Sequence, residues 1–451
     1  LETYSDLGSP QGSPMINSAS LERVSVLDLV TGTDSSIIVT AAGSDAMPSE
    51  ISDRVSNVSQ MIEECLKRGI PRSKIYVDAL VFPISVDQNF GNHYLESVIE
   101  IRRQFGNEIH ITGGLSNVSF GLPMRKLIND TFIKRAKIIK GIRDYLDQLG
   151  FLEVETPVLQ PLYGGANARP FTTHHNALDQ KLFLRIADEL YLKRLIIGGI
   201  DRVYELSKDF RNEGMDRNHN PEFTMLEFYW AYADYKDNMD LVENMIKDVA
   251  KSVGSLMITW GEMKIDLSKP FQRKPIFELL KEATGRDMSN LGTDELRKIC
   301  KKDNIQIEDD ANYGQILDCL MSELVEPNLI QPTFVIDYPK EISPLAKKHR
   351  NGDPNLVERF ELFIGSAEFA NAFSELNDPI DQRERFEAQA KLGKAGDDEA
   401  HPVDENFLQA IECGMPPTGG VGIGIDRLVM LLTENLSIKD VILFPAMRKE
   451  D

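Results

Sequence analysis

Basic side chains are few relative to acidic ones in this chain. Its 451 residues include 50 Lys and Arg against 71 Asp and Glu, which gives a formal net charge of −21. Binding along a nucleic acid requires concentrated positive charge to neutralise the phosphates. The composition therefore excludes a protein that wraps nucleic acid with its whole surface, and any RNA contact must be local.

Cysteines and long apolar runs are also scarce. The four cysteines, Cys65, Cys300, Cys319 and Cys413, are far apart and show no paired, metal-type spacing. We therefore expect free thiols in a reducing compartment, with neither a zinc site nor a disulfide framework. The sequence has no run of about 18 apolar residues and no basic-then-apolar leader, so we expect no membrane span, no secretory signal and a cytoplasmic location.

Two patterns of secondary structure divide the chain. Residues 36–113 alternate short apolar strands with amphipathic helices, which predicts a β/α unit with parallel strands. After Phe132 the strands alternate as in an antiparallel sheet flanked by helices. The sequence thus predicts an α+β protein with a first domain over 1–131 and a second over 132–451, in which a charged helical insertion spans about 275–326.

A predicted hairpin over 202–235 carries the strongest functional signal. Two alternating segments flank the polar loop GMDRNHNP, which is the pattern of a long antiparallel hairpin. The second strand places Phe223, Glu227 and Tyr229 at odd positions. A ring, a carboxylate and a phenol therefore share one face of the strand.

The first strand of this hairpin and its loop add charged groups. By the same parity we expect Arg211 and Glu213 to share a strand face, beside a loop that contains His219. A guanidinium and an imidazole can bind phosphate oxygens, a ring can stack on a base, and carboxylates can hold an ammonium. One hairpin could therefore bind a nucleotide and a cationic group, although charged faces of this kind are most often simply solvated.

Two further segments supply matching groups. Gly420, Gly422 and Gly424 recur at period two, so that one strand face lacks side chains and a ligand can approach the backbone. Arg427 follows at the start of an apolar helix. Earlier in the chain, apolar alternation directs several acids inward, and buried acids require cations such as Mg²⁺ or a cationic substrate. That segment contains Glu361, Glu368, Asn371 and Glu375.

Three segments of the first domain resemble a known family. MINSAS, YVDALVFPIS and GGLSNVSFGLPMRKLINDTF are similar to the pterin-binding domain of methyltetrahydrofolate:corrinoid methyltransferases, over about 13–132. The resemblance covers only the later part of that family's barrel, a partial TIM barrel, and implies that Asn17, Asp78 and Asn117 bind a folate or other pterin. Amide and carboxylate groups suit a pterin edge, which has donors and acceptors. The alternative is that these residues end strands and turns in a remnant without activity.

The second domain resembles the class II aminoacyl-tRNA synthetases. FLEVETPVL, the hairpin with FRNEG, and GIGIDR are similar to motifs one, two and three of that class, in that order. GGANARPFTTHHNALD, ADELYLKRL and NAFSELNDP narrow the resemblance to the lysyl-tRNA synthetases, from about residue 132 onward. The resemblance implies a class II antiparallel sheet, ATP-dependent activation of L-lysine as lysyl-adenylate, transfer to lysine tRNA, Mg²⁺ as cofactor, and a homodimer formed through motif one, which contains Pro157.

The same resemblance implies a role for each residue of the predicted site. ATP binding is expected of Arg211, Glu213, His219, Phe223 and Arg427, and the catalytic residues among them are Arg211 and Arg427. Magnesium binding is expected of Glu361 and Glu368. Lysine binding is expected of Gly165, Glu189, Glu227, Tyr229, Asn371 and Glu375. Physical reasoning also favours lysine, because an uncharged side chain would leave the carboxylates of this set unpaired.

Two alternatives to a lysine–tRNA ligase remain open. Lysyl-tRNA synthetases normally carry an N-terminal OB-fold, and the pterin-like segment stands in that position here. A protein-lysylating relative also lacks the OB-fold, although ELYLKR, GGANARPF and the helical insertion follow the full synthetase. A pterin-binding or methyl-transfer module fused to a synthetase domain is the second alternative.

Overall fold

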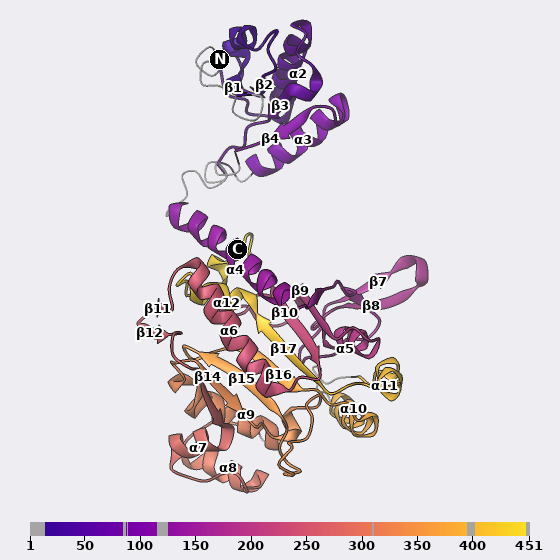
Figure 1. Ribbon diagram of the computed structural model, residues 1–451, viewed down its shortest axis with the longest axis vertical. Coiled ribbons are helices and arrows are strands. Elements are labelled where there is room, and N and C mark those ends of the chain that lie inside the picture. Colours follow the sequence, from indigo (N-terminus) through magenta and orange to yellow (C-terminus); the bar gives the residue numbers. More distant parts are fainter. Residues whose placement is uncertain are drawn as a thin grey trace. The chain divides into compact units, whose positions relative to one another are not determined.

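The chain divides into two units, Leu1–Asp130 and Thr131–Asp451 (Figure 1). The computed structural model describes residues 14–83, 87, 89–114, 125–308, 311–394 and 402–447. Each unit has a sheet and a hydrophobic core of its own. Among the helices in these described ranges, none is both long and apolar enough to cross a membrane.

A parallel sheet forms the first unit. In spatial order its strands are β1 (Met15–Ala19), β2 (Ser36–Thr40), β3 (Ile75–Asp78) and β4 (His110–Thr112). The strands are joined in turn by η1 (Leu21–Leu29), α2 (Ile51–Lys67) and α3 (Phe90–Phe105). The β/α arrangement with parallel strands that the sequence predicted is confirmed.

Alternation along β2 and β3 builds the core of this first unit. Ile37 and Val39 of β2 and Ile75 and Val77 of β3 are fully buried in one apolar cluster with side chains of α2. Successive side chains of a strand point to opposite faces, so these residues share the face that α2 covers. Asp78 then stands at the carboxyl end of β3, where parallel β/α units commonly place functional groups.

An eight-stranded sheet is the centre of the second unit. In spatial order its strands are β13 (Gln272–Pro275), β14 (Thr333–Ile336), β15 (Arg359–Ile364), β16 (Ala367–Ser374), β17 (Thr418–Gly424), β10 (Glu222–Ala231), β9 (Arg202–Phe210) and β5 (Leu152–Glu153). Neighbouring strands are antiparallel, except that the pairs β13–β14 and β5–β9 are parallel. The predicted α+β class is confirmed, and β9 and β10 form the predicted hairpin.

Helices pack on both faces of this sheet. One apolar core contains side chains of α4 (Arg125–Gln148), α6 (Tyr235–Val253) and α12 (Ile425–Leu432), and α6 and α12 lie over the sheet in Figure 1. Leu226 and Phe228 of β10 enter that core. Tyr229 instead packs with α5 (Glu189–Ile197), and Glu227 shares its side of the strand. Strand parity therefore separates an apolar face from a face that carries functional groups.

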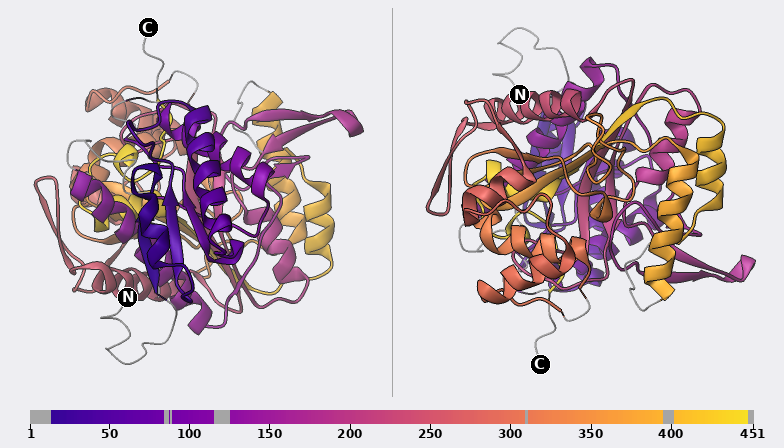
Figure 2. Two further views of the ribbon diagram at one scale, coloured as in Figure 1. Left: turned by 90° about the horizontal axis from the view of Figure 1, so that it is seen from above. Right: turned by 90° about the horizontal axis from the view of Figure 1, so that it is seen from below.

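Three helices between β13 and β14 form a separate layer. They are α7 (Ile276–Thr284), α8 (Thr293–Lys302) and α9 (Tyr313–Leu324), and Figure 2 shows them as one group. Leu280, Leu296 and Leu317 are fully buried in their shared core, which also includes Val335 of β14 and Phe363 of β15. These helices therefore pack on the side of the sheet where β14 and β15 lie.

Smaller elements complete the second unit. A three-stranded sheet contains β6 (Leu159–Gln160), β8 (Gln180–Leu184) and β7 (Thr172–His175), and its β7–β8 hairpin protrudes in every view (Figures 1 and 2). A two-stranded sheet and two helices are also present: β11 (Met257–Trp260), β12 (Met263–Asp266), α10 (Pro379–Lys394) and α11 (Glu405–Glu412).

Candidate active site

A cavity of about 510 Å³ lies on the α5 side of the large sheet. Its walls come from α5, β10, β16 and β17 and from the loop that joins β9 to β10. Every residue that the sequence analysis expects to bind ATP, lysine or magnesium lines this cavity. They are Gly165, Glu189, Arg211, Glu213, His219, Phe223, Glu227, Tyr229, Glu361, Glu368, Asn371, Glu375 and Arg427.

One end of the cavity is basic and partly open to solvent. The Arg211 guanidinium lies 5.1 Å from the centroid of the Phe223 ring, and Nη2 of Arg427 lies 3.0 Å from Nε2 of His219. Nδ1 of His219 contacts the Asp216 carboxylate at 2.8 Å. Two guanidinium groups, an imidazole and an aromatic ring can together bind phosphate oxygens and stack on a base.

Arg211 and Glu213 do not share a strand face, contrary to the sequence prediction. Strand β9 ends at Phe210, and both residues lie in the loop that follows it. The Arg211 N–H still donates to the carbonyl oxygen of Pro221 (2.9 Å), so the hairpin closes one residue beyond the strand. Both side chains reach the cavity, but from a loop, where strand parity does not decide their direction.

The other end of the cavity is acidic and buried. Glu227 is 5% exposed; its Oε1 accepts the N–H of Asp188 (3.1 Å) and its Oε2 accepts the hydroxyl of Tyr229 (3.0 Å). Glu375 is 1% exposed, and within the described part of the chain its Oε1 has no hydrogen-bond partner. Burial raises the pKa of both carboxyls above the usual range. A bound cation would therefore stabilise both groups in the ionised form.

Two glycines of β17 shape the floor between these ends. A Cβ atom at Gly420 would clash with the Glu375 carboxylate and with the ring of Tyr229. At Gly422, the nearest atoms to such a Cβ include Cγ of Glu227 at 3.9 Å, an ordinary contact. Gly420 is therefore required by the packing of the acidic end, whereas Gly422 leaves room on the floor for a ligand.

Comparison with known proteins identifies the family. Residues 116–448 match the tRNA synthetases class II (D, K and N). The chain belongs to this family of class II synthetases. The lysine–tRNA ligase of Carboxydothermus hydrogenoformans is 56% identical over 327 residues, which are 72% of this chain and 67% of the relative. Those of Staphylococcus saprophyticus and Listeria monocytogenes are 57% identical over 322 residues, 71% of this chain and 65% and 64% of the relatives. The class II synthetase chain thus spans about two thirds of the length of these curated relatives.

The first unit of this class II synthetase has a separate match. Residues 6–140 match the pterin binding enzymes, so the predicted resemblance is confirmed for this part as well. Asn17 lies within β1, opposite Ile38 of β2, which in turn lies opposite Tyr76 of β3. Asp78 ends β3, two residues after Tyr76. Asn117 lies outside the described residues. Oδ1 of Asp78 accepts the N–H of Leu80 (2.9 Å), and burial raises the pKa of this carboxyl.

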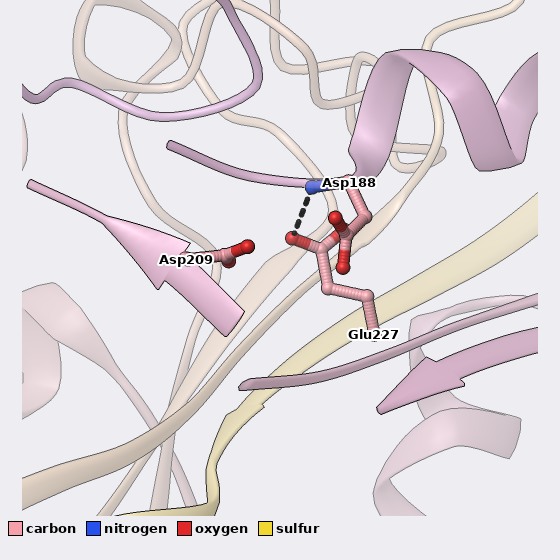
Figure 3. Close-up of side chains that lie close together, drawn as sticks. All are labelled: Asp188, Asp209 and Glu227. Atoms are coloured by element: carbon pink, nitrogen blue, oxygen red, sulfur yellow. Dashed lines mark hydrogen bonds between the residues drawn. The ribbon is translucent and has the colours of Figure 1, made fainter. Parts of the chain in front are cut away.

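Next to Glu227, the synthetase has a buried group of acids that the sequence analysis missed. Carboxylate oxygens of Asp188, Asp209 and Glu227 lie within 4.8 Å of one another (Figure 3). Nη1 of Arg185 lies 3.0 Å from Oδ1 of Asp188, and its Nε lies 3.4 Å from Oδ1 of Asp209. Burial, followed by the repulsion of neighbouring acids, raises the pKa of Asp188 to about 8. Arg185 also pairs with Glu205 (2.6 Å), so its charge does not balance these acids, and Asp188 favours a proton near neutral pH.

A buried lysine is the second feature that the sequence analysis missed. Lys193 of α5 is fully buried and forms ion pairs with Glu189 and with Glu375. The i,i+4 spacing of Glu189 and Lys193 within ADELYLKRL was an available signal for the first pair. No local pattern indicated the second pair, because Glu375 comes from a distant segment.

The acids predicted to hold magnesium have neighbours of the same sign. Glu361 accepts the hydroxyl of Tyr338 (2.7 Å) and pairs with Arg359. Asp318 of α9, which the sequence analysis did not single out, lines the same cavity, and burial, then the charge of Glu361, raises its pKa. Burial, then these two acids, raises the pKa of Glu326 to about 7. Clustered carboxylates of this kind fit a divalent cation, and Mg²⁺ prefers such oxygen ligands.

Proposed function

We propose that this chain activates L-lysine with ATP as lysyl-adenylate and transfers the lysyl group to lysine tRNA. The observation that carries the proposal is a single cavity with a basic end suited to ATP and a buried acidic end suited to an ammonium group. The names of the relatives, lysine–tRNA ligases, support the same substrate.

Buried carboxylates would select the amino acid. Glu227, Tyr229 and Glu375 would surround the ε-ammonium of lysine. Gly165 and Glu189 would hold its α-amino group. A neutral amino acid would add no positive charge to that of Lys193 among these buried carboxylates, and a site built for a charged partner rejects ligands that lack it. Arginine would present a longer and planar cation to the same compact pocket.

The reaction needs no protein nucleophile. A carboxylate oxygen of lysine attacks the α-phosphorus of ATP in line. The new oxygen–phosphorus bond forms as the bond from the α-phosphorus to the α,β-bridging oxygen breaks, and pyrophosphate leaves. Arg211 would bind the α-phosphate and stabilise the charge that develops there. Phe223 and Arg427 would hold the two faces of the adenine, Glu213 its amino group, and His219 the terminal phosphates. The protein thus contributes positioning and charge stabilisation.

Glu361 and Glu368 would hold Mg²⁺ beside the phosphates. When bound, Mg²⁺ would neutralise charge on the phosphate oxygens. Burial, then the repulsion of Glu361, raises the pKa of Glu368, which is the environment that a cation relieves. Asn371, opposite Glu361 in the β15–β16 register, would contact the lysine carboxylate.

Pyrophosphate exchange with a panel of amino acids tests the first step. We expect ATP–pyrophosphate exchange that depends on lysine and is weak with arginine, ornithine and neutral amino acids. An absence of exchange with lysine would contradict the proposal. Charging of lysine tRNA, compared with lysylation of a protein acceptor in the same assay, then distinguishes a tRNA ligase from a protein-lysylating relative.

We also propose that the synthetase forms a homodimer through the segment around Pro157. Apolar side chains near it are exposed in the single chain, as expected of a surface that a second copy covers. They are Leu152, Val158, Leu159 and Leu162, which are 51%, 39%, 49% and 37% exposed. Light scattering after size-exclusion chromatography should give twice the chain mass, and a monomer at all concentrations would contradict the proposal.

A second proposal concerns the first unit, which would bind a folate or other pterin through Asn17, Asp78 and Asn117. The match to pterin binding enzymes and the half-buried carboxyl of Asp78 at a strand end support it. Calorimetric titration of the full chain with methyltetrahydrofolate should give a saturable binding isotherm, and Asp78→Ala should abolish the binding. A flat isotherm would mean that this unit is a remnant.

A further inference from the structure

Lys193 is the one lysine of α5, and it stands behind the acidic end of the cavity. Its side chain is 0% exposed and is absent from the cavity wall, whereas both of its ion-pair partners, Glu189 and Glu375, line that wall. The ammonium also lies 5.9 Å from the centroid of the Phe407 ring. Lys193 therefore contacts the two carboxylates from inside the protein, behind the cavity wall.

The two partners of Lys193 come from different parts of the chain. Glu189 is in the first turn of α5, and Glu375 directly follows β16. A single nitrogen atom that pairs with both holds the two carboxylates at one fixed separation. Under the proposed function these are the groups that receive opposite ends of the substrate, the α-amino group at Glu189 and the ε-ammonium at Glu375.

Lys193 also supplies a positive charge at the acidic end of the cavity. Three glutamates, including Glu227, meet at this end, and a buried carboxylate without a cation takes up a proton. A neutral carboxyl attracts an ammonium far less than a carboxylate does. Lys193 opposes the rise in pKa that burial causes in both Glu189 and Glu375.

Gly420 fixes the second side of the Glu375 carboxylate. Oε2 of Glu375 forms the ion pair with Lys193, and Oε1 occupies the space that a side chain at Gly420 would take. The carboxylate is thus held between Lys193 and the backbone of β17, at the acidic end of the cavity.

We propose that Lys193 is a positioning residue for lysine specificity. By bridging Glu189 and Glu375 it favours the ionised form of both carboxylates and sets the distance between the sites for the α-amino and ε-ammonium groups. This spacing discriminates lysine from ornithine, a shorter diamino acid. The inference rests on the proposed lysine activation and deepens it.

Lys193→Met in the full chain tests the inference, because methionine preserves most of the shape and removes the charge. In lysine-dependent pyrophosphate exchange we expect the KM for lysine to rise at least about 100-fold, the KM for ATP to change less than about twofold, and the preference for lysine over ornithine to fall about tenfold. The matched control is Arg194→Met, which removes a neighbouring cation paired with Asp404 and should leave the KM for lysine unchanged.

A background without either acid separates positioning from a general structural role. If Lys193 acts through its two partners, adding Lys193→Met to the Glu189→Gln/Glu375→Gln variant should leave the KM for lysine of that variant unchanged. This comparison also holds if Lys193→Met alone fails to fold, because the triple variant removes all three charges of the bridge. A further tenfold rise in the triple variant would overturn the inference, as would Lys193→Met with wild-type KM and preference. Lack of lysine-dependent exchange in the wild type would instead overturn the proposed function and this inference with it.

Discussion

The two ends of the cavity carry charge in different ways. At the basic end, the side chains of His219 and Arg427 are 52% and 22% exposed, so solvent screens them when no ligand is bound. At the acidic end, Glu227, Glu375 and Lys193 are at most 5% exposed. The basic end can therefore exist without a ligand at little cost, whereas the acidic end depends on partners inside the fold. This difference predicts that changes at the two ends affect different kinetic constants.

The largest effect is expected at Arg211, where the two substrates would react. Arg211→Ala should lower kcat for lysine-dependent pyrophosphate exchange at least about 1000-fold, because the charge that develops on the α-phosphate loses its main donor. Arg383→Ala is the control, since this arginine pairs with Glu405 at the surface and should leave the rate unchanged. An Arg211→Ala rate within tenfold of the wild type would remove Arg211 from the reaction.

A pair of isosteric changes should separate the two ends. Glu375→Gln should raise the KM for lysine about 100-fold and leave the KM for ATP within about twofold, because the buried carboxylate would be the partner of the ε-ammonium of lysine. Glu213→Gln should instead raise the KM for ATP and leave the KM for lysine nearly unchanged, because Glu213 would contact only the adenine. Initial rates of exchange with either substrate varied measure both constants. If both variants changed the KM for lysine and the KM for ATP equally, the cavity would not have separate ends for the two substrates.

A smaller effect is expected at the aromatic ring of the basic end. Phe223→Ala should raise the KM for ATP about tenfold, because stacking on the adenine is lost, and leave the KM for lysine unchanged. Phe223→Tyr, which keeps the ring, should remain within about twofold of the wild type. If the alanine variant also matched the wild type, the adenine would have to bind elsewhere in the cavity.

The smallest effect concerns stability rather than rate. The raised pKa of Asp188, about 8 against an ordinary 3.8, means that the folded chain binds a proton more tightly than the unfolded chain between these values. The Asp188 carboxyl therefore lowers the free energy of unfolding as the pH rises from about 4 to about 8. Asp188→Asn should raise the thermal midpoint by about 3 °C at pH 8 and by much less at pH 5.

Differential scanning fluorimetry at the two pH values measures the Asp188 effect. Asp144→Asn is the control, because Asp144 is half-exposed and pairs with Lys140 one turn away on α4. If Asp188→Asn raised the thermal midpoint equally at pH 5 and pH 8, the charge of Asp188 in the wild type would not change across this range.

Much of the cavity could be predicted from local patterns. The odd positions of Phe223, Glu227 and Tyr229 place them on one face because alternation depends only on the strand backbone. The same rule failed for Arg211 and Glu213 because it requires a strand, and β9 ends just before them. Their place in the cavity was correct for a different reason, the resemblance of FRNEG to motif two.

The missed groups share one property. Arg185 and Asp188 are three residues apart, whereas Asp209 comes from β9 and Glu227 from β10, and each looks like an ordinary charged residue in the sequence. Their effect on Glu227 arises from burial and from distances of a few ångströms, which no local pattern contains. Asp318 was missed in the same way, because it reaches the cavity from the helical insertion.

The sequence by itself determined the class II family, the parallel and antiparallel halves of the chain, and the residues expected to bind ATP, lysine and Mg²⁺, all of which line the cavity. These follow from motifs and alternation, which depend on residues close to one another along the chain. Only the tertiary structure decided which distant acids share a buried cation: Glu375 pairs with Lys193, and Asp209 lies beside Arg185. The reason is physical, since the charge state of a buried group depends on what folding places within a few ångströms of it.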